Sequence, residues 1–344
     1  MSSQHTLFSS LSKIISQDLG TRGIDKLLQN ASKDISEDYN VQSIVRIVHD
    51  YILNSIMTLV DSTSSSSENS NKKFVAIITG FSVPPNGYAE TDGPLGAIWI
   101  GLGVLRFTPL NVLYFVDENQ YEGMLKFLKM VFGNDEQRVK IVKVTRQDCN
   151  DIHQASAECK DYLDDIHSFI SIERVGRSKD GKCYSMRGIE ISGYNLALDI
   201  IIEYVQKKHP NTPLVSIGDG GNEIGMGSVL EHVEKCIPNG EKIACVMKSD
   251  FLLVCGVSNW GGYILYLLFE YCRNAIVENK PMQGIDVQID LNYLTFMVNE
   301  CQMVDGVRNQ ATISVDGLDY DPIHVQVVNE LNHLFDIDMK KKNL

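Results

Sequence analysis

Five of the ten residues between Gly218 and Gly227 are glycine, and the only charged residues among them are two carboxylates, Asp219 and Glu223. A mainly apolar run, residues 213–217, leads directly into this segment. Glycine accepts positive φ and lets a backbone approach a ligand closely, so a glycine-rich segment after a strand predicts a binding loop. Neither common nucleotide fingerprint is present, because no Lys-Ser/Thr pair follows the glycines and the G-x-G-x-x-G spacing fails at Glu223. We therefore expect Asp219 and Glu223 to face a metal ion or a cationic or proton-exchanging group, and we take both as catalytic candidates. The candidate substrate contacts in this loop are Gly220, Gly221 and Asn222.

A second acidic segment, Glu90-Thr91-Asp92-Gly93-Pro94, follows the apolar run at 74–79 and leads into a helical pattern. Carboxylate oxygens are the ligands that hard divalent cations such as Mg²⁺ and Mn²⁺ prefer. We therefore predict a site for Mg²⁺ or Mn²⁺ assembled from two loops, with no nucleotide or organic cofactor. Its predicted ligands are Glu90, Asp92, Asp219 and Glu223. A capped helix start explains residues 91–94 equally well and leaves Glu90 as the less explained residue.

Arginines near another strand end are suited to binding a carboxylate or a phosphate with two hydrogen bonds. Arg174 and Arg177 follow the apolar run at 169–172, and we predict them as substrate contacts together with Asn259. A salt bridge for Glu173-Arg174 and helix capping for Asn259 are the alternatives. No histidine lies in any of these loops, which disfavours a histidine-based nucleophilic relay and zinc ligation, so a general base would be a carboxylate. Further candidates are Arg22, Arg187 and Asp305, the last of which a late turn would also explain.

The elements that must position these residues alternate between apolar, β-rich runs and helical patterns. Such strands are buried on both faces, and their alternation with helices predicts an α/β fold with a mainly parallel central sheet flanked by helices in Rossmann-like layers. In such sheets ligands bind beyond the carboxyl ends of the strands, where nearly every polar cluster named above falls. The predicted strands are Phe74–Thr79, Val112–Val116, Val139–Val144, Phe169–Ile172, Leu214–Ile217, Phe251–Val257 and Thr312–Val315. The predicted helices are Leu95–Leu105, Tyr121–Phe132, Ile152–Ile166, Tyr194–Lys208, Ser228–Cys236 and Gly262–Ile276.

Before the first strand, residues 41–60 show helical spacing of apolar residues, and residues 62–71 are a Ser/Asn-rich run that cannot form a core. We predict a helical N-terminal extension at 1–61 that packs on the core, a flexible loop at 62–73, an α/β domain at 74–338 and a frayed tail at 339–344.

Composition restricts the environment and the partners. The net charge of -13 argues against nucleic acid and against an anionic membrane surface as partners. Eight scattered cysteines without a C-x-x-C pair are typical of reduced thiols, and the N-terminus lacks the features of a signal peptide. No apolar run approaches the roughly 20 residues of a membrane span. We expect a soluble, cytoplasmic protein with a small anionic substrate.

Several of these segments together resemble one family, the C-terminal domain of D-glutamate cyclases and its stand-alone relatives. The matching segments are Asp18–Ile24, Thr79–Phe81, Glu90–Pro94, Ile172–Arg177, Ser216–Gly227, Ser258–Gly261 and Val304–Val307. The resemblance implies that the amine of D-glutamate attacks its side-chain carboxyl to give 5-oxo-D-proline and water, with a metal or an arginine polarising the carboxyl and a carboxylate such as Glu223 taking the ammonium proton. Full-length cyclases also carry a large N-terminal domain that has no counterpart in residues 1–73.

Two other functions fit the same residues. Acidic loops and arginines at the strand ends of an α/β sheet would also serve a metal-dependent phosphohydrolase. A non-catalytic module that binds a small molecule is the second alternative, and it is disfavoured because unpaired carboxylates in a cleft are costly without a cation or a proton.

Overall fold

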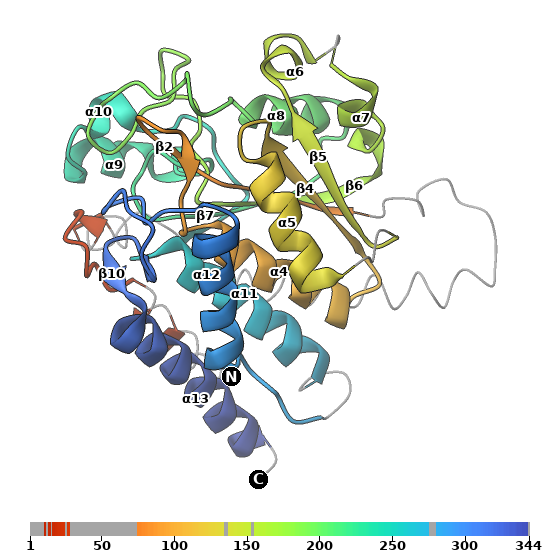
Figure 1. Cartoon of the computed structure of the whole chain (residues 1–344), viewed down its shortest axis with the longest axis vertical. Coiled ribbons are helices and arrows are strands. Elements are labelled where there is room, and N and C mark those ends of the chain that lie inside the picture. The colour runs from red at the N-terminus through yellow and green to blue at the C-terminus, as the bar shows by residue number, and fades with distance from the viewer. Residues whose placement is uncertain are drawn as a thin grey trace, which may run out of the picture.

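The computed structural model describes residues 10–27 except 12, 15 and 25, and residues 74–342 except 134–136, 153–154 and 275–279. The helix predicted at 41–60 and the loop predicted at 62–73 lie outside the described residues, as does most of the predicted N-terminal extension. A six-stranded sheet, parallel throughout, forms the centre of the described chain in the order β5-β4-β1-β6-β7-β8. The α/β prediction is therefore confirmed (Figure 1). The strands are β1 (Phe74–Thr79), β4 (Asn111–Asp117), β5 (Val139–Val144), β6 (Ile166–Ile172), β7 (Leu214–Gly218) and β8 (Phe251–Val254).

The strand order identifies where a ligand would bind. The first strand of the sheet, β1, lies in its middle. The chain then adds β4 and β5 on one side of β1 and returns to pair β6 with the other side. This is a doubly wound arrangement, and its crevice opens at the carboxyl ends of β1 and β6, where the winding direction reverses. The crevice is the expected position of a ligand site.

Helices cover both faces of the sheet because alternate strand side chains point to opposite sides. In β1, Val75 and Ile77 join one core, whereas Ala76 and Ile78 join the other. The first core is covered by α4 (Pro94–Phe107), α5 (Tyr121–Phe132), α11 (Ser258–Tyr271), α12 (Val287–Glu300) and α13 (Val325–Lys342). The second core is covered by elements that include α7 (Ala157–Lys160) and α8 (Asp199–Lys208). Between α8 and β8, α9 (Leu230–Cys236) and α10 (Gly240–Ile243) pack with Ile24 and Leu27 of the N-terminal segment.

Two predictions about single elements were wrong. The helix predicted at 152–166 is broken into α7, a short 3₁₀ turn and the start of β6. The strand predicted at 312–315 is not in the main sheet, since β9 (Ser314–Val315) pairs only with β10 (Leu318–Asp319) in an antiparallel hairpin. Helix α13 continues to Lys342, within the tail predicted at 339–344. Within the described residues, no helix is both long and apolar enough to span a membrane.

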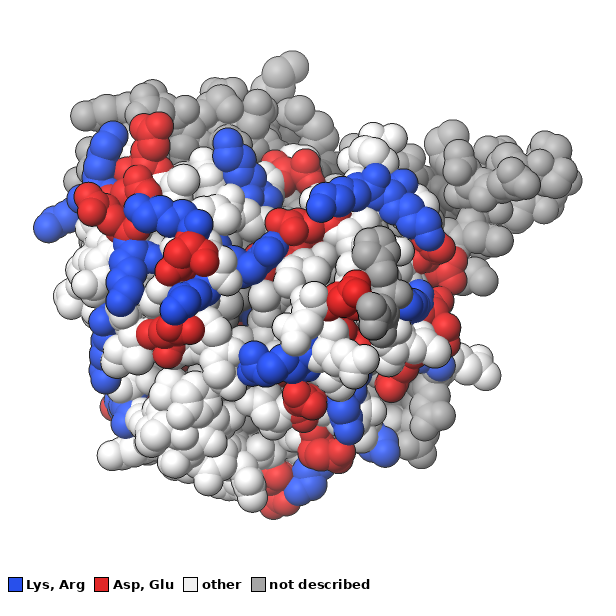
Figure 2. All heavy atoms as spheres, turned by 90° about the horizontal axis from the view of Figure 1, so that it is seen from above, with Lys and Arg blue, Asp and Glu red and all other residues white. Residues whose placement is uncertain are grey.

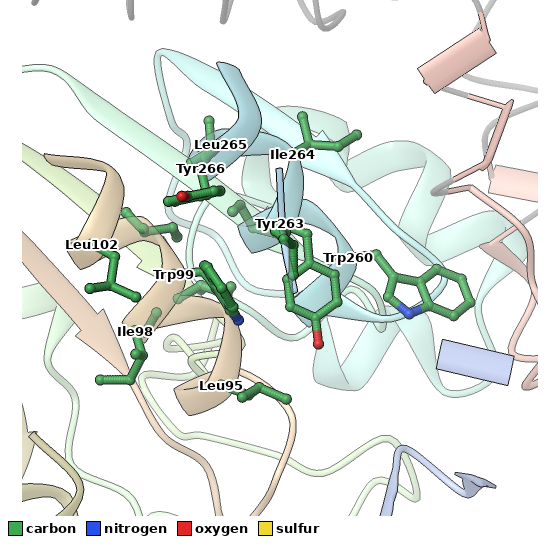
Figure 3. Close-up of a cluster of buried hydrophobic side chains, with 14 of the residues drawn as sticks. Leu95, Ile98, Trp99, Leu102, Trp260, Tyr263, Ile264, Leu265 and Tyr266 are labelled. Atoms are coloured by element: carbon green, nitrogen blue, oxygen red, sulfur yellow. The ribbon is translucent and has the colours of Figure 1, made fainter. Parts of the chain in front are cut away.

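The helices α4 and α11 lie against each other and bring their N-termini to the crevice. Figure 3 shows their facing side chains, which include Trp99 on α4 and Tyr263 on α11. Glycines allow the close approach, because a Cβ added at Gly262 would lie only 2.5 Å from the Cα of Gly96. The side-chain oxygen of Asn259 also accepts hydrogen bonds from the backbone N–H groups of Gly93 and Gly96, at 2.9 and 2.7 Å. The two helices are thus fixed at the end that faces the crevice.

The Gly262→Ala variant should be destabilised. An added methyl group must push α11 away from the backbone of α4, and overpacking of this kind costs about 1–3 kcal/mol, more than the gain of up to about 1 kcal/mol in helix propensity. Equilibrium denaturation would measure the loss. Gly193→Ala is the matched control, because a Cβ at Gly193 would meet nothing within 4 Å; equal stability of the two variants would contradict the close packing.

Candidate functional site

A cleft of about 370 Å³ opens at the carboxyl ends of the central strands. Carboxylates reach the cleft from the connections that follow three neighbouring strands of the sheet. Glu90 and Asp92 lie between β1 and α4, Glu173 directly follows β6, and Asp219 and Glu223 follow β7. Arg22 comes from the N-terminal segment and Asp316 from the β9–β10 turn. The face shown in Figure 2 carries acidic and basic side chains close together rather than one broad patch of either sign.

Three carboxylates form the centre of the cleft. Asp92, Glu173 and Asp219 each place an oxygen so that the three atoms lie within 4.8 Å of one another, and all three residues are buried. Ser258, at the first turn of α11, contacts all of them. Its backbone N–H donates to Oδ2 of Asp92 at 3.0 Å and to Oδ2 of Asp219 at 3.2 Å, and its hydroxyl donates to Oε2 of Glu173 at 2.6 Å. The N-terminal end of a helix favours negative charge, so α11 stabilises this cluster.

Burial and mutual repulsion alter the proton affinity of these acids. Burial, with the neighbouring Asp92 charge, raises the pKa of Asp219 to about 7 even though Arg22 opposes the shift. Burial also raises the pKa of Asp92, and it raises the pKa of Glu173 well above its usual range with help from the charges of Asp219 and Glu223. Burial, together with the charges of Asp92 and Asp219, also raises the pKa of Glu90 well above its usual range. The cleft therefore favours a bound cation or bound protons over a full set of bare carboxylates.

Glu223 lies in the cleft but is engaged by its own loop. Its carboxylate accepts hydrogen bonds from the backbone N–H groups of Asp219, Gly220 and Gly221, at 3.0, 2.5 and 2.6 Å. Burial and the Asp219 charge raise the pKa of Glu223 to about 7. A carboxylate held by three amides fixes the conformation of the glycine-rich loop and so the direction of Asp219. Gly220 and Gly221 contribute their backbone amides to this arrangement, and they do not line the cleft.

Two of the predicted arginines pair with acids of the protein itself. Arg174 is fully buried and bonds both carboxylate oxygens of Asp117, at 2.7 and 2.8 Å, as well as the carbonyls of Gly80 and Leu196. Arg177 pairs with Asp199 and Glu203. Neither lines the cleft. The salt-bridge alternative for Arg174 therefore describes its position, and Asp117 is its partner.

Asn259 and Asp305 also organise backbone around the cleft without lining it. Asn259 is buried and joins the starts of α4 and α11, as described above, and its amide also donates to the carbonyl of Thr91. Asp305 is buried and accepts from the hydroxyl of Ser314 and from the backbone N–H groups of Val307, Arg308 and Gly317. It thereby shapes the loop that carries Asp316.

The remaining predicted residues, Arg22, Arg187 and Asn222, line the cleft. Arg187 is exposed at its mouth. Arg22 pairs with Asp219 at 2.8 Å and also contacts Asp316. The amide of Asn222 donates to the carbonyl of Tyr184 at 2.7 Å and so ties the glycine-rich loop to a neighbouring hairpin.

Three important cleft residues were missed by sequence reasoning: Glu173, Ser258 and Asp316. Glu173 adopts a φ of 41°, which is uncommon for a residue other than glycine. This backbone conformation directs Glu173 into the cleft while Arg174 points into the protein. The signal in the sequence was the charged pair itself at the end of a buried strand, but it did not show which member faced the ligand.

The chain is similar to known proteins over most of its length. The family described as "D-glutamate cyclase-like, C-terminal" matches residues 11–332, a range that contains all the cleft carboxylates. The chain is also 29% identical over 286 residues to the human protein named "D-glutamate cyclase, mitochondrial", covering 76% of this chain and 46% of that protein. The chain therefore spans less than half the length of this relative. By the extent of the family match, this chain belongs to the D-glutamate cyclase-like family and corresponds to its C-terminal region.

Proposed function

We propose that this protein is an enzyme that converts D-glutamate to 5-oxo-D-proline and water. One observation carries the proposal: the cluster of Asp92, Glu173 and Asp219 lies at the crevice of a doubly wound sheet in a chain of the D-glutamate cyclase-like family. Glu90, outside the cluster but in the same acidic cleft, suits the ammonium group of an amino acid, and the exposed Arg187 at the mouth suits its α-carboxylate. The substrate and its stereochemistry come from the family and are part of the proposal.

The reaction needs proton transfer more than it needs a nucleophile from the protein. The substrate amine forms a bond to the carbon of its own side-chain carboxyl, and one carbon–oxygen bond breaks. Two protons leave the nitrogen, and both are found on the oxygen that departs as water. Positioning supplies much of the rate enhancement for such a ring closure, and carboxylates with raised pKa values can accept and return the protons.

Glu90 is the proton acceptor that the geometry favours. It is half-buried in the cleft, and within the described residues its carboxylate has charged neighbours but no hydrogen-bond partner. Glu223, the acceptor expected from the sequence, is instead held by three backbone amides. We therefore assign proton transfer to Glu90, and loop organisation to Glu223.

We further propose that the cleft binds a divalent cation, Mg²⁺ or Mn²⁺. The residues that would hold it are Asp92, Glu173 and Asp219, whose oxygen atoms converge. When bound, the cation would polarise the side-chain carboxyl of the substrate and favour loss of its oxygen. Compared with the ligand set expected from the sequence, Glu173 joins Asp92 and Asp219, and Glu90 and Glu223 take other roles.

Incubation of metal-stripped protein with D-glutamate or L-glutamate, with and without Mn²⁺, tests the proposed function. We expect 5-oxoproline to form from D-glutamate and to require the cation. Absence of 5-oxoproline under all conditions would contradict the cyclase proposal. Release of phosphate from a phosphomonoester, in that case, would support the phosphohydrolase alternative, whereas binding of D-glutamate without turnover would support the non-catalytic module.

The Glu90→Gln variant should lose turnover without losing stability. Removal of a general base costs roughly 10²–10⁴-fold in rate, and the amide keeps the size of the side chain at a half-buried position. The measurements are kcat for 5-oxoproline formation and the melting temperature. The control is Glu118→Gln, an exposed acid at the end of β4 that does not line this cleft. Full activity of Glu90→Gln would contradict the assignment.

A further inference from the structure

We propose that Arg22, held by Asp316, is a positioning residue that orients Asp219 for cation binding. This inference rests on the proposed function, because it needs the cation site at Asp92, Glu173 and Asp219. It adds to that site a segment from the far N-terminal end of the described chain, 197 residues away from Asp219 in sequence, and a carboxylate from the β9–β10 turn.

The two oxygens of Asp219 have different partners. Oδ1 accepts a hydrogen bond from Nη1 of Arg22 at 2.8 Å, whereas Oδ2 accepts from the N–H of Ser258 at 3.2 Å. Ser258 donates the same N–H to Asp92, so Oδ2 is the oxygen beside that carboxylate. The bond to Arg22 therefore fixes the rotation of the Asp219 carboxylate with one oxygen toward the cluster. Hydrogen bonds of this kind orient metal-binding carboxylates in other proteins.

Arg22 is itself held from several directions. Its second guanidinium nitrogen contacts Asp316 and lies 3.4 Å from the carbonyl oxygen of Gly256. Its backbone is fixed by a turn in which the Asp18 carboxylate accepts hydrogen bonds from the N–H groups of Arg22 and Gly23, both at 2.8 Å. The side chain is only 19% exposed, and Asp316 is 7% exposed. Such a guanidinium has little freedom to rotate and can hold Asp219 in one orientation.

The segment that carries Arg22 is packed against the cleft rather than loosely attached to it. Ile24 and Leu27 are buried in the core around α9, and the carbonyl of Gln17 lies so close to Gly256 that a Cβ there would clash. A Cβ at Gly23 would likewise lie 2.9 Å from the carbonyl oxygen of Cys236. Arg22 is thus placed by tertiary contacts along its whole neighbourhood.

Electrostatics alone predicts the opposite of this role, and that makes the proposal testable. Arg22 is a positive charge beside a proposed cation site, so its removal should tighten cation binding by Coulomb's law if charge is its only effect. If Arg22 positions Asp219, its removal should weaken binding, because Asp219 is then free to turn away. The sign of the change in affinity distinguishes the two.

The experiment is calorimetric titration of the metal-stripped full chain with Mn²⁺, without substrate, for wild type and Arg22→Gln. We expect the dissociation constant to rise by about 10–100-fold in the variant, the range found for partners that orient metal ligands. Arg187→Gln is the matched control, since it removes a positive charge from the same cleft and we expect it not to weaken Mn²⁺ binding. Binding by Arg22→Gln that equals or exceeds that of wild type would overturn the proposal.

Two further variants keep the test decisive if Arg22→Gln folds poorly. Arg22→Lys retains the charge but replaces the two guanidinium nitrogens that contact Asp219 and Asp316 by a single, freely rotating ammonium. Positioning therefore predicts weaker Mn²⁺ binding, whereas charge alone predicts no change. Asp316→Asn replaces the ion pair with Arg22 by a neutral contact at a residue whose φ of 56° suits asparagine. It should also weaken binding, but the loss of a cleft carboxylate has the same effect by charge, so Arg22→Lys is the variant that separates positioning from charge. The control for Asp316→Asn is Asp319→Asn, whose exposed carboxylate pairs with Arg308. Unchanged affinity in Arg22→Lys would overturn the inference.

The outcome for wild type separates this inference from the proposed function. If wild type binds no Mn²⁺, the proposal of a cation site is wrong, and the proposal that Arg22 positions Asp219 is then wrong as well. If wild type binds Mn²⁺ and the variants bind it equally well, only the positioning role is wrong.

Discussion

Asp219→Asn is expected to abolish the stabilisation of the protein by Mn²⁺ and to lower turnover by roughly 10³-fold, since a Lewis-acid cation is worth several kcal/mol in the transition state. Asp219 belongs to the cluster of three carboxylates that we propose as cation ligands, and it is also paired with Arg22. A cation that binds only the folded protein raises its apparent stability by mass action. Loss of a ligand should therefore remove the rise in melting temperature that Mn²⁺ gives to wild type.

Without metal the same variant should be no less stable than wild type. Burial, with the Asp92 charge, raises the pKa of Asp219 to about 7, and a neutral amide removes both the cost of burying the charge and the repulsion from Asp92. The expected pattern is an unchanged or higher melting temperature in the metal-stripped variant, together with no response to Mn²⁺. Thermal unfolding with and without Mn²⁺, and the 5-oxoproline assay, measure both parts. A normal response to Mn²⁺ in Asp219→Asn would show that the cation binds elsewhere.

Arg174→Met is expected to lower the free energy of unfolding by about 3–5 kcal/mol, because it leaves the Asp117 carboxylate buried without its partner. Both side chains are fully buried, and burial already raises the pKa of Asp117 against the opposing effect of Arg174. The carbonyls of Gly80 and Leu196 would lose a donor as well. Equilibrium denaturation in urea measures the change.

The double variant Arg174→Met/Asp117→Asn is the control for this explanation. It removes both charges, and the amide oxygen introduced at position 117 can still accept the hydrogen bond that the Leu196 N–H now gives to Asp117. We expect it to be more stable than Arg174→Met alone, since no charge is left unpaired in the interior. A stable Arg174→Met protein with weakened substrate binding would instead restore the role as substrate contact that the sequence suggested.

The sequence by itself determined the type of fold and the position of the cleft acids along the chain. Continuous apolar runs such as residues 74–79 and 214–217 can be satisfied only by strands buried on both faces, and they are β1 and most of β7. Because parallel strands place their carboxyl ends at one edge, the acids at 90, 92, 219 and 223 were expected to converge, and all four line the cleft. The sequence pattern is sufficient for these two predictions because the residues of a buried strand must be mainly apolar, and because the residues that follow parallel strands lie at the same edge of the sheet.

The tertiary structure alone decided which polar residue faces the cleft and which supports the fold. Glu173 and Arg174 are adjacent charged residues, and the sequence does not show which of them faces the ligand. The backbone conformation at Glu173 directs Glu173 into the cleft and Arg174 toward Asp117. The pairing of Arg22 with Asp219 and Asp316 joins three distant parts of the chain. No local pattern records such a contact, because it depends on the order of the strands and on how the N-terminal segment packs beside them. The sequence therefore identified four of the cleft acids and missed Glu173 and Asp316, whereas the fold assigned the partners of all of them.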